Sequence, residues 1–260
     1  MNYENRITVF LDILGFKEII KETLDKDGND NLEKINDLNG ALEKIREFLD
    51  IDLPEGHFSK SKIVTQFSDS VVISFLHTET SEVFYTLSDI HDLLINLALR
   101  GIICRGGVAF GKLIHNEKFI YGPAMITAYE TESKAAMYPR IILDKSIIKL
   151  AAENHAVHHL PTDEINALKS FITVDGDGML YIDYIEKSQQ ELDDPENDMP
   201  LYIDKLKEII ETGLNKAKSP DIKVKYTWMK TKANRLIDRM KKGTYSGDLQ
   251  EYYTNIKRIE

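Results

Sequence analysis

The sequence has almost no cysteine, with Cys104 alone among 260 residues. A single cysteine cannot form a disulfide framework, and it excludes the cysteine-rich zinc modules. The first residues lack the basic flank and long apolar run of a signal peptide. No run of about 18 consecutive apolar residues occurs, so the sequence predicts no membrane-spanning helix. We therefore expect a cytoplasmic protein without a membrane partner.

Positive charge is also scarce relative to negative charge. The chain carries 33 Lys and Arg against 43 Asp and Glu, a formal net charge of −10. Such a chain repels a phosphate backbone, which argues against nucleic acid as a partner. Hydrophobic residues make up 42% and charged residues 29%, a composition typical of a folded soluble domain and too apolar for a disordered one.

The hydrophobic patterns predict strands and helices in alternation. Expected strands cover 7–14, the two halves of 62–77, 104–115 with its return at 119–122, 139–144, and the hairpin 171–185. Expected helices cover 16–24, 32–49, 83–97, 122–137 and 146–153, and two more follow an acidic connector at 190–200. This order indicates an α+β sandwich, with helices on one face of a mostly antiparallel sheet. We predict a main domain over 1–188, with a C-terminal helical extension over 189–260 packed on it.

Two aspartates stand out against this pattern. Asp12 interrupts an apolar strand, where an unpaired carboxylate costs free energy, and Asp69 lies in the tight connection of residues 62–77. Asp69 alone is typical of an ordinary turn residue. If the first two strands are neighbours, however, both carboxylates lie at one sheet edge, an arrangement that suits Mg²⁺ or Mn²⁺ shared with phosphates. Gly15, directly before a helix, would add free backbone N–H groups for a phosphate.

Four segments together resemble class III nucleotidyl cyclases. They are FLDILGF (10–16), FSDSVVISF (67–75), RGGVAFGKL (105–113) and GPAMITAYETES (122–133). In that family they correspond to the strand with the first metal-binding Asp, the turn with the second, a glycine-containing strand, and the start of a helix. The matches occur in the family's order across residues 7–144. The resemblance implies a class III cyclase-like α/β sandwich as the main domain.

The same resemblance implies the roles of the metal-site residues. Asp12 and Asp69, with the Ile13 carbonyl, would hold two divalent cations, Mg²⁺ or Mn²⁺. Backbone amides of Leu14, Gly15 and Phe16 would hold the phosphates. Because the sites of this family form between two domains, the resemblance also implies a homodimer.

The chain departs from the family where the substrate is read. The Asn and Arg that the family's helix offers to the substrate are replaced by Ile126 and Glu130, and the positions that usually select a purine hold Thr65 and Phe119. We take Arg105 and Lys134 as candidate catalytic cations in place of the missing arginine, although each could equally form a surface ion pair. Further candidate substrate contacts are Ser68, Tyr129 and Arg140.

These variant motifs are similar to the pyrimidine cyclases of Pycsar anti-phage systems. That likeness implies conversion of UTP or CTP to cyclic UMP or cyclic CMP and pyrophosphate, with a separate effector that responds to the product. The sequence does not choose between UTP and CTP, and the preference for UTP comes from the resemblance alone. Two alternatives remain: an adenylate or guanylate cyclase, and a catalytically silent nucleotide-binding or dimerisation module.

Overall fold

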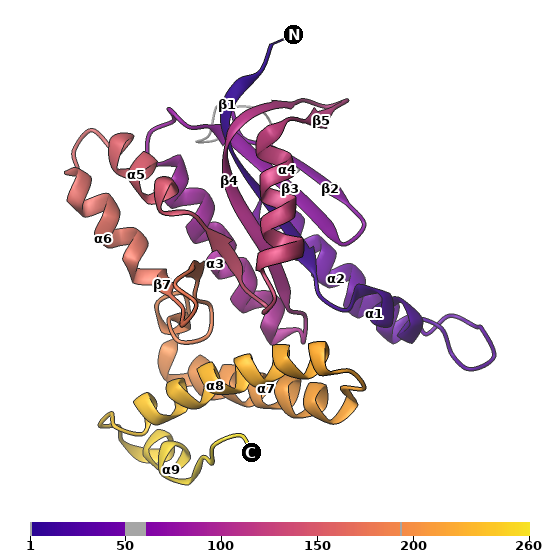
Figure 1. Cartoon of the computed structure of the whole chain (residues 1–260). Helices are drawn as coiled ribbons and strands as arrows, with labels where there is room; N and C mark the ends of the chain where they lie inside the picture. Colours follow the sequence, from indigo (N-terminus) through magenta and orange to yellow (C-terminus); the bar gives the residue numbers. More distant parts are fainter. Residues whose placement is uncertain (1, 50–60, 193) are drawn as a thin grey trace.

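The computed structural model describes residues 2–49, 61–192 and 194–260. Within them one sheet has the strand order β2-β3-β1-β4-β6-β8-β7, with β5 paired to the far end of β4 (Figure 1). All neighbouring strands are antiparallel except β4 and β6. The strands are β1 (Glu4–Ile13), β2 (Ile63–Phe67), β3 (Ser70–Leu76), β4 (Cys104–His115), β5 (Ile120–Tyr121), β6 (Ile141–Leu143), β7 (Ile172–Val174) and β8 (Leu180–Ile182).

Most helices connect strands. The helices are α1 (Phe16–Glu22), α2 (Leu32–Phe48), α3 (Glu82–Leu99), α4 (Pro123–Glu130), α5 (Lys145–Glu153), α6 (Pro161–Phe171), α7 (Pro195–Lys216), α8 (Pro220–Met240) and α9 (Gly247–Asn255), with short η1 (Thr131–Ala135) and η2 (Ser188–Gln190) turns, and α7, α8 and α9 follow the last strand. The predicted α+β class, with a mostly antiparallel sheet and C-terminal helices, is confirmed. Among the described residues, no helix is both long and apolar enough to cross a bilayer.

The sheet is covered on both faces, which corrects the expectation of helices on one face only. Ile7, Val9 and Leu11 of β1 are fully buried in the large core that also contains side chains of α2, α3 and α7. Phe10, on the opposite face of β1, belongs to a smaller apolar cluster with Ala128 of α4. Consecutive strand residues point to opposite faces. The uninterrupted apolar run of β1 therefore reflects burial on both sides of a central strand.

Gly107 allows α4 to lie close to the sheet. A Cβ atom at this position would be 2.5 Å from the carbonyl oxygen of Ala128 and 2.7 Å from Cβ of Thr131. We expect Gly107→Ala to lower the free energy of unfolding by about 1–3 kcal/mol, because backbone and neighbouring helix must move apart. Urea unfolding measures the change. Gly176→Ala is the matched control, since a Cβ at Gly176 meets no atom within 4 Å; equal losses in both variants would contradict the close-packing explanation.

The hydrophobic patterns did not predict α6 or α9, and they placed the start of α7 too late. The segment expected to be an acidic connector contains the start of α7, where Asp194 accepts a hydrogen bond from the N–H of Asn197. Acidic residues favour a helix N-terminus because they complement its dipole, so these charges begin a helix. The signal for α6 was present, because Pro161 followed by Asp163 and Glu164 is typical of a first helical turn.

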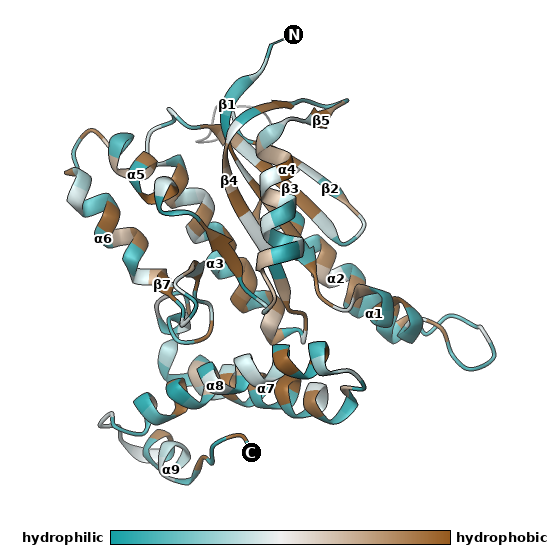
Figure 2. Cartoon of the chain, in the orientation of Figure 1, coloured by the Kyte–Doolittle hydropathy of each residue, from teal (hydrophilic) through white to brown (hydrophobic). Residues whose placement is uncertain are grey.

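The C-terminal helices form a layer beyond one end of the sheet (Figure 1). Tyr202 and Leu206 of α7 and Leu236 of α8 are buried in the same core cluster as the strands. In Figure 2 much of β4 has the apolar colour, whereas the loop after α1 is hydrophilic. The division of the chain at residue 188 stays a prediction.

Candidate metal and nucleotide site

Asp12 is at the end of β1, between two neighbouring strands. It pairs with Ser70 of β3 on one side and Arg105 of β4 on the other. The Ser70 hydroxyl donates a hydrogen bond to Oδ1 of Asp12 at 3.2 Å, and Nη2 of Arg105 is 3.8 Å from Oδ2. The Asp12 side chain is 21% exposed. The Asp12 carboxylate is therefore partly exposed at the end of the sheet. Ser70 contacts one of its oxygens and Arg105 the other.

Asp69 is in the two-residue turn between β2 and β3, next to the end of β1. The preceding Ser68 has φ 56°, a left-handed conformation that tight hairpin turns require. The N–H of Ile13 donates to the carbonyl oxygen of Asp69 at 3.2 Å. The strand beside β1 is β3 rather than β2, but the turn still brings Asp69 to Asp12. In the described part of the chain, no hydrogen bond or ion pair holds the Asp69 carboxylate.

The electrostatics of Asp12 fit a cation site. Burial raises the pKa of Asp12, and the nearby negative charge of Asp69 raises it further, whereas Ser70 and Arg105 lower it. A net upward shift means that the neighbours do not fully compensate the negative charge, so a divalent cation would stabilise the ionised form. Among the described residues no group of three or more His, Cys, Asp and Glu side chains surrounds a metal position. Two carboxylates fit Mg²⁺, which commonly takes one or two carboxylates and completes its coordination with water and substrate phosphates.

The phosphate-binding backbone predicted beside Asp12 needs one correction. The N–H of Leu14 already donates to the carbonyl of Ile103 at 2.9 Å, because the chain continues the β1–β4 pairing there. That amide is therefore not free for a phosphate. Gly15 caps α1 with φ 76°, and its carbonyl accepts from the amides of Glu18 and Ile19. Phe16 begins the helix, where first-turn amides lack intrahelical partners.

The two predicted catalytic cations lie in different surroundings. Arg105 forms an ion pair through Nε with the buried Glu132 of η1 in addition to its contact with Asp12. Lys134 is exposed, and its Nζ is 2.6 Å from the Glu130 carboxylate. Burial raises the pKa of Glu132, and the Arg105 guanidinium opposes that rise. Arg105 is therefore positioned by Glu132 at the Asp12 site, whereas Lys134 pairs along its own helix.

Thr65 contacts His115, a residue that no sequence motif indicated. Oγ1 of Thr65 is 2.8 Å from Nε2 of His115, which also lies 2.8 Å through Nδ1 from the hydroxyl of Ser74. His115 is at the end of β4, three strands away from β2 in the sheet order. The end of β4 therefore crosses over the sheet face to reach β2, which the strand pattern alone does not reveal.

The remaining aromatic candidates are exposed. Phe119 precedes β5 and is 56% exposed, while Tyr129 of α4 is 52% exposed. The Tyr129 ring packs edge-on against Phe10, with 5.5 Å between the ring centroids. Both aromatic rings are thus available at the surface on the α4 side of the sheet.

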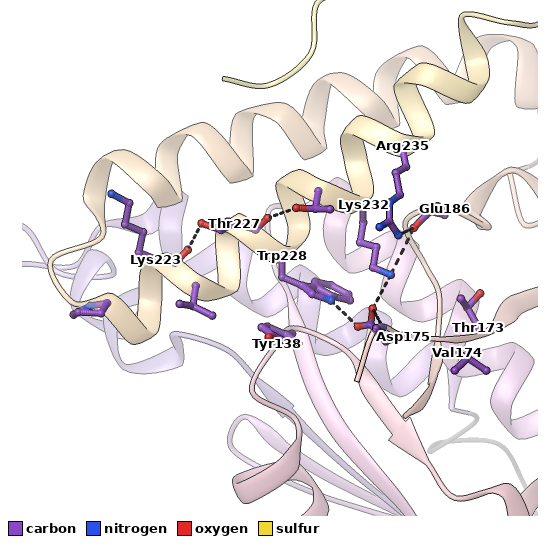
Figure 3. A pocket seen from close by; sticks show the side chains of 14 residues that line it. Tyr138, Thr173, Val174, Asp175, Glu186, Lys223, Thr227, Trp228, Lys232 and Arg235 are labelled. Atoms are coloured by element: carbon purple, nitrogen blue, oxygen red, sulfur yellow. Dashed lines mark hydrogen bonds and ion pairs between the residues drawn. The ribbon is translucent and has the colours of Figure 1, made fainter. Parts of the chain in front are cut away.

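Arg140 lies in a separate, buried charge cluster. Its side chain has no exposed surface and forms ion pairs with Asp175 and Asp177 in the β7–β8 turn. Asp175 also accepts from Nε1 of Trp228 at 2.7 Å and pairs with Lys232 at 3.0 Å, both from α8 (Figure 3). The structure therefore brings Arg140 to the C-terminal helices rather than to Asp12, and its predicted substrate contact has no support in this geometry. A cavity of about 810 Å³ lies beside this cluster.

Comparison of the chain with known proteins gives structural similarity without a match in sequence. No protein-family model matches it, and no curated protein matches it in sequence. Among solved structures, the crystal structure of the adenylyl cyclase CyaB from P. aeruginosa is similar, with a TM-score of 0.44 and 14% identity over 70% of this chain and 95% of that chain.

Proposed function

We propose that this chain is a nucleotidyl cyclase that converts a pyrimidine nucleoside triphosphate, UTP or CTP, to its 3′,5′-cyclic monophosphate and pyrophosphate. The observation that carries the proposal is the meeting of Asp12 and Asp69 at one end of the sheet, next to the glycine-capped start of α1. The motif resemblance of residues 7–144 supports the same reaction. Arg105, held at Asp12 by Glu132, supplies a cation for charge on the phosphates.

The two aspartates and the Ile13 carbonyl would hold two divalent cations, Mg²⁺ or Mn²⁺. When bound, these cations would lower the pKa of the ribose 3′-hydroxyl and neutralise the triphosphate. In the reaction the 3′-oxygen attacks the α-phosphorus and loses its proton to solvent water. The bond from the α-phosphorus to the bridging oxygen breaks, and pyrophosphate leaves with the electron pair. Arg105 and the amides of Gly15 and Phe16 stabilise charge on the phosphate oxygens.

A homodimer with sites at its interface is part of the proposal. The α4 side of the sheet exposes large apolar side chains, including Phe67 at 82%, Phe119 at 56% and Ile126 at 61%. Apolar surface gathered on one side of a protein is typical of an interaction surface. A second copy of the chain that covers this side would bury it and complete the site, with Ser68 and Tyr129 as further substrate contacts.

The biological proposal follows from the Pycsar resemblance. The cyclic pyrimidine nucleotide would act as a second messenger in bacterial anti-phage defence, and a separate effector protein would bind it. The loss of the purine-selecting pattern at Thr65 and Phe119 favours this role over a purine cyclase.

A panel of nucleoside triphosphates tests the proposal. With Mn²⁺ and each of ATP, GTP, UTP and CTP, we expect cyclic UMP or cyclic CMP as the main product, identified by mass spectrometry. A strong cyclic AMP or cyclic GMP product without pyrimidine products would establish a purine cyclase instead. No cyclic product from any of the four would leave the silent binding module as the better description.

A further inference from the structure

A hydrogen-bonded chain of four side chains crosses the α4 side of the sheet and ends at Thr65. Nε of Arg6 donates to the Ser74 hydroxyl at 2.9 Å, Ser74 contacts Nδ1 of His115 at 2.8 Å, and Nε2 of His115 contacts the Thr65 hydroxyl at 2.8 Å. Arg6 is 2% and His115 5% exposed, and Ser74 is fully buried. Only Thr65, on the edge strand β2, reaches partial exposure.

The protons of this chain have one consistent arrangement. Burial lowers the pKa of His115 to about 4, and the positive charge of Arg6 lowers it too, so the imidazole is neutral at neutral pH. A neutral imidazole has one donor nitrogen and one acceptor nitrogen. Arg6 is always a donor, so Ser74 accepts from it and uses its single proton elsewhere.

His115 is the acceptor that the Ser74 proton can reach. In the described residues, the hydroxyl of Ser74 has no contact other than Arg6 and His115, and Thr8, opposite Ser74 on β1, has a buried hydroxyl with no hydrogen-bond partner. Ser74 therefore donates to Nδ1, which places the imidazole proton on Nε2. Nε2–H then donates to Thr65 Oγ1, and the Thr65 hydroxyl proton is directed away from His115.

Thr65 is placed to meet the base of a nucleotide bound at Asp12. Thr65 is two residues from Phe67, which pairs with Ser70, and Ser70 pairs with Asp12, so Thr65 and Asp12 share one face of the sheet. Strand spacings put them about 12 Å apart, the scale of a nucleotide that extends from phosphate to base. The two subunits of a homodimer are identical, so the Thr65 hydroxyl of either subunit would direct its proton in the same way.

We infer that His115 is a specificity-determining positioning residue, which makes the Thr65 hydroxyl a hydrogen-bond donor to the base and thereby favours uracil over cytosine. The inference rests on the proposed function for the location of the nucleotide. At position 4 of the ring, uracil has a carbonyl oxygen that accepts a hydrogen bond, whereas cytosine has an amino group that donates. Nε2–H occupies one of the two lone pairs of Oγ1, so the Thr65 hydroxyl has its proton and only one lone pair left for the base. Donation to the uracil oxygen uses that proton, whereas pairing with the cytosine amino group would turn it away from the base, which penalises cytosine.

Binding of α,β-methylene UTP and α,β-methylene CTP tests this inference independently of turnover, because these analogues cannot release pyrophosphate. Isothermal titration calorimetry with Mg²⁺ should show the uridine analogue binding at least about 10-fold more tightly to the wild type. Thr65→Val and His115→Phe should reduce this preference to within about 3-fold, and Thr65→Ser, which keeps the hydroxyl, should retain it. Tighter binding of the cytidine analogue, or a preference unchanged in both Thr65→Val and His115→Phe, would overturn the inference.

The protonated nitrogen of His115 gives a second, binding-free readout. We expect ¹⁵N chemical shifts of the imidazole to show a neutral ring protonated at Nε2 at pH 7 in the wild-type protein. A ring protonated at Nδ1 would reverse the direction of the chain and overturn the inference, even if His115→Phe fails to fold. Absence of cyclic products combined with a uridine binding preference would reject the proposed reaction while supporting the role of His115.

Discussion

Replacing Asp69 with alanine is expected to lower cyclase turnover by at least about 10³-fold, because one of the two carboxylates that we propose to bind the cations is lost. The Asp69 carboxylate has no hydrogen bond or ion pair to described residues, so its removal leaves no protein group unpaired. We therefore expect folding to be retained. The measurements are the initial rate with the preferred triphosphate and Mn²⁺, and the circular dichroism spectrum of the variant.

Asp27→Ala is the matched control for Asp69→Ala. Asp27 is also a turn aspartate, but it is exposed and lies in the loop after α1 (Figure 1). Its replacement should leave turnover unchanged. If Asp69→Ala keeps more than about a tenth of wild-type turnover while Asp27→Ala is normal, Asp69 does not bind a catalytic cation.

Replacing Asp175 with alanine is expected to lower the free energy of unfolding by about 3–5 kcal/mol, the range for breaking a buried ion pair by removing one partner. Asp175 joins the fully buried Arg140 to Lys232, whose side chain is 4% exposed. Both cations would lose a carboxylate that is only 11% exposed, and Trp228 would lose its acceptor. Urea unfolding followed by circular dichroism measures the change.

Asp177→Ala provides the comparison for Asp175→Ala. Asp177 also pairs with Arg140, but its side chain is 43% exposed against 11% for Asp175. Solvent screens the more exposed pair, so its loss should cost clearly less. Similar losses in the two variants would show that burial of the Asp175 contacts is not the source of stability.

The effect of Asp175→Ala should also depend on pH. Burial raises the pKa of Asp175, but hydrogen bonds from Lys232, the Gly176 amide and Trp228 outweigh it, and the pKa is lowered from its ordinary value of 3.8. A carboxylate with a lowered folded-state pKa stabilises the fold fully above its unfolded value and loses this contribution as the pH falls through its folded value. The difference in stability between wild type and Asp175→Ala should therefore be constant near neutrality and shrink below pH 3.8.

Asp12 could be selected from the sequence, because the free-energy cost of placing a carboxylate in an apolar strand can be recognised from that strand alone. Asp69 could be placed beside it because a hairpin turn lies at the end of its strands, although the neighbour of β1 is β3 rather than β2. The roles of Lys134 and Arg140 could not be decided in this way. Which carboxylate a long cationic side chain reaches depends on elements that only the fold brings together, such as the β7–β8 turn beside Arg140.

The contacts of His115 could not be predicted from the hydrophobic pattern of the sequence. Nothing near His115 in the sequence distinguishes it from any other residue of its strand, because its partners Thr65 and Ser74 lie 50 and 41 residues away in the chain. The contact exists because the end of β4 crosses over β1 and β3. Hydrophobic periodicity describes which face a residue occupies, and it carries no information about a strand that bends across that face.

The periodicity of apolar residues by itself predicted the α+β fold class, and the two aspartates at strand ends were by themselves candidate metal ligands. These follow from interactions within a strand, a turn or a helix. The tertiary structure alone decided that helices cover both faces of the sheet, that Leu14 has no free amide, that Arg105 is held at Asp12, and that His115 contacts the hydroxyl of Thr65. Each of these depends on hydrogen bonds and ion pairs between distant segments, whose geometry forms only when the chain is packed.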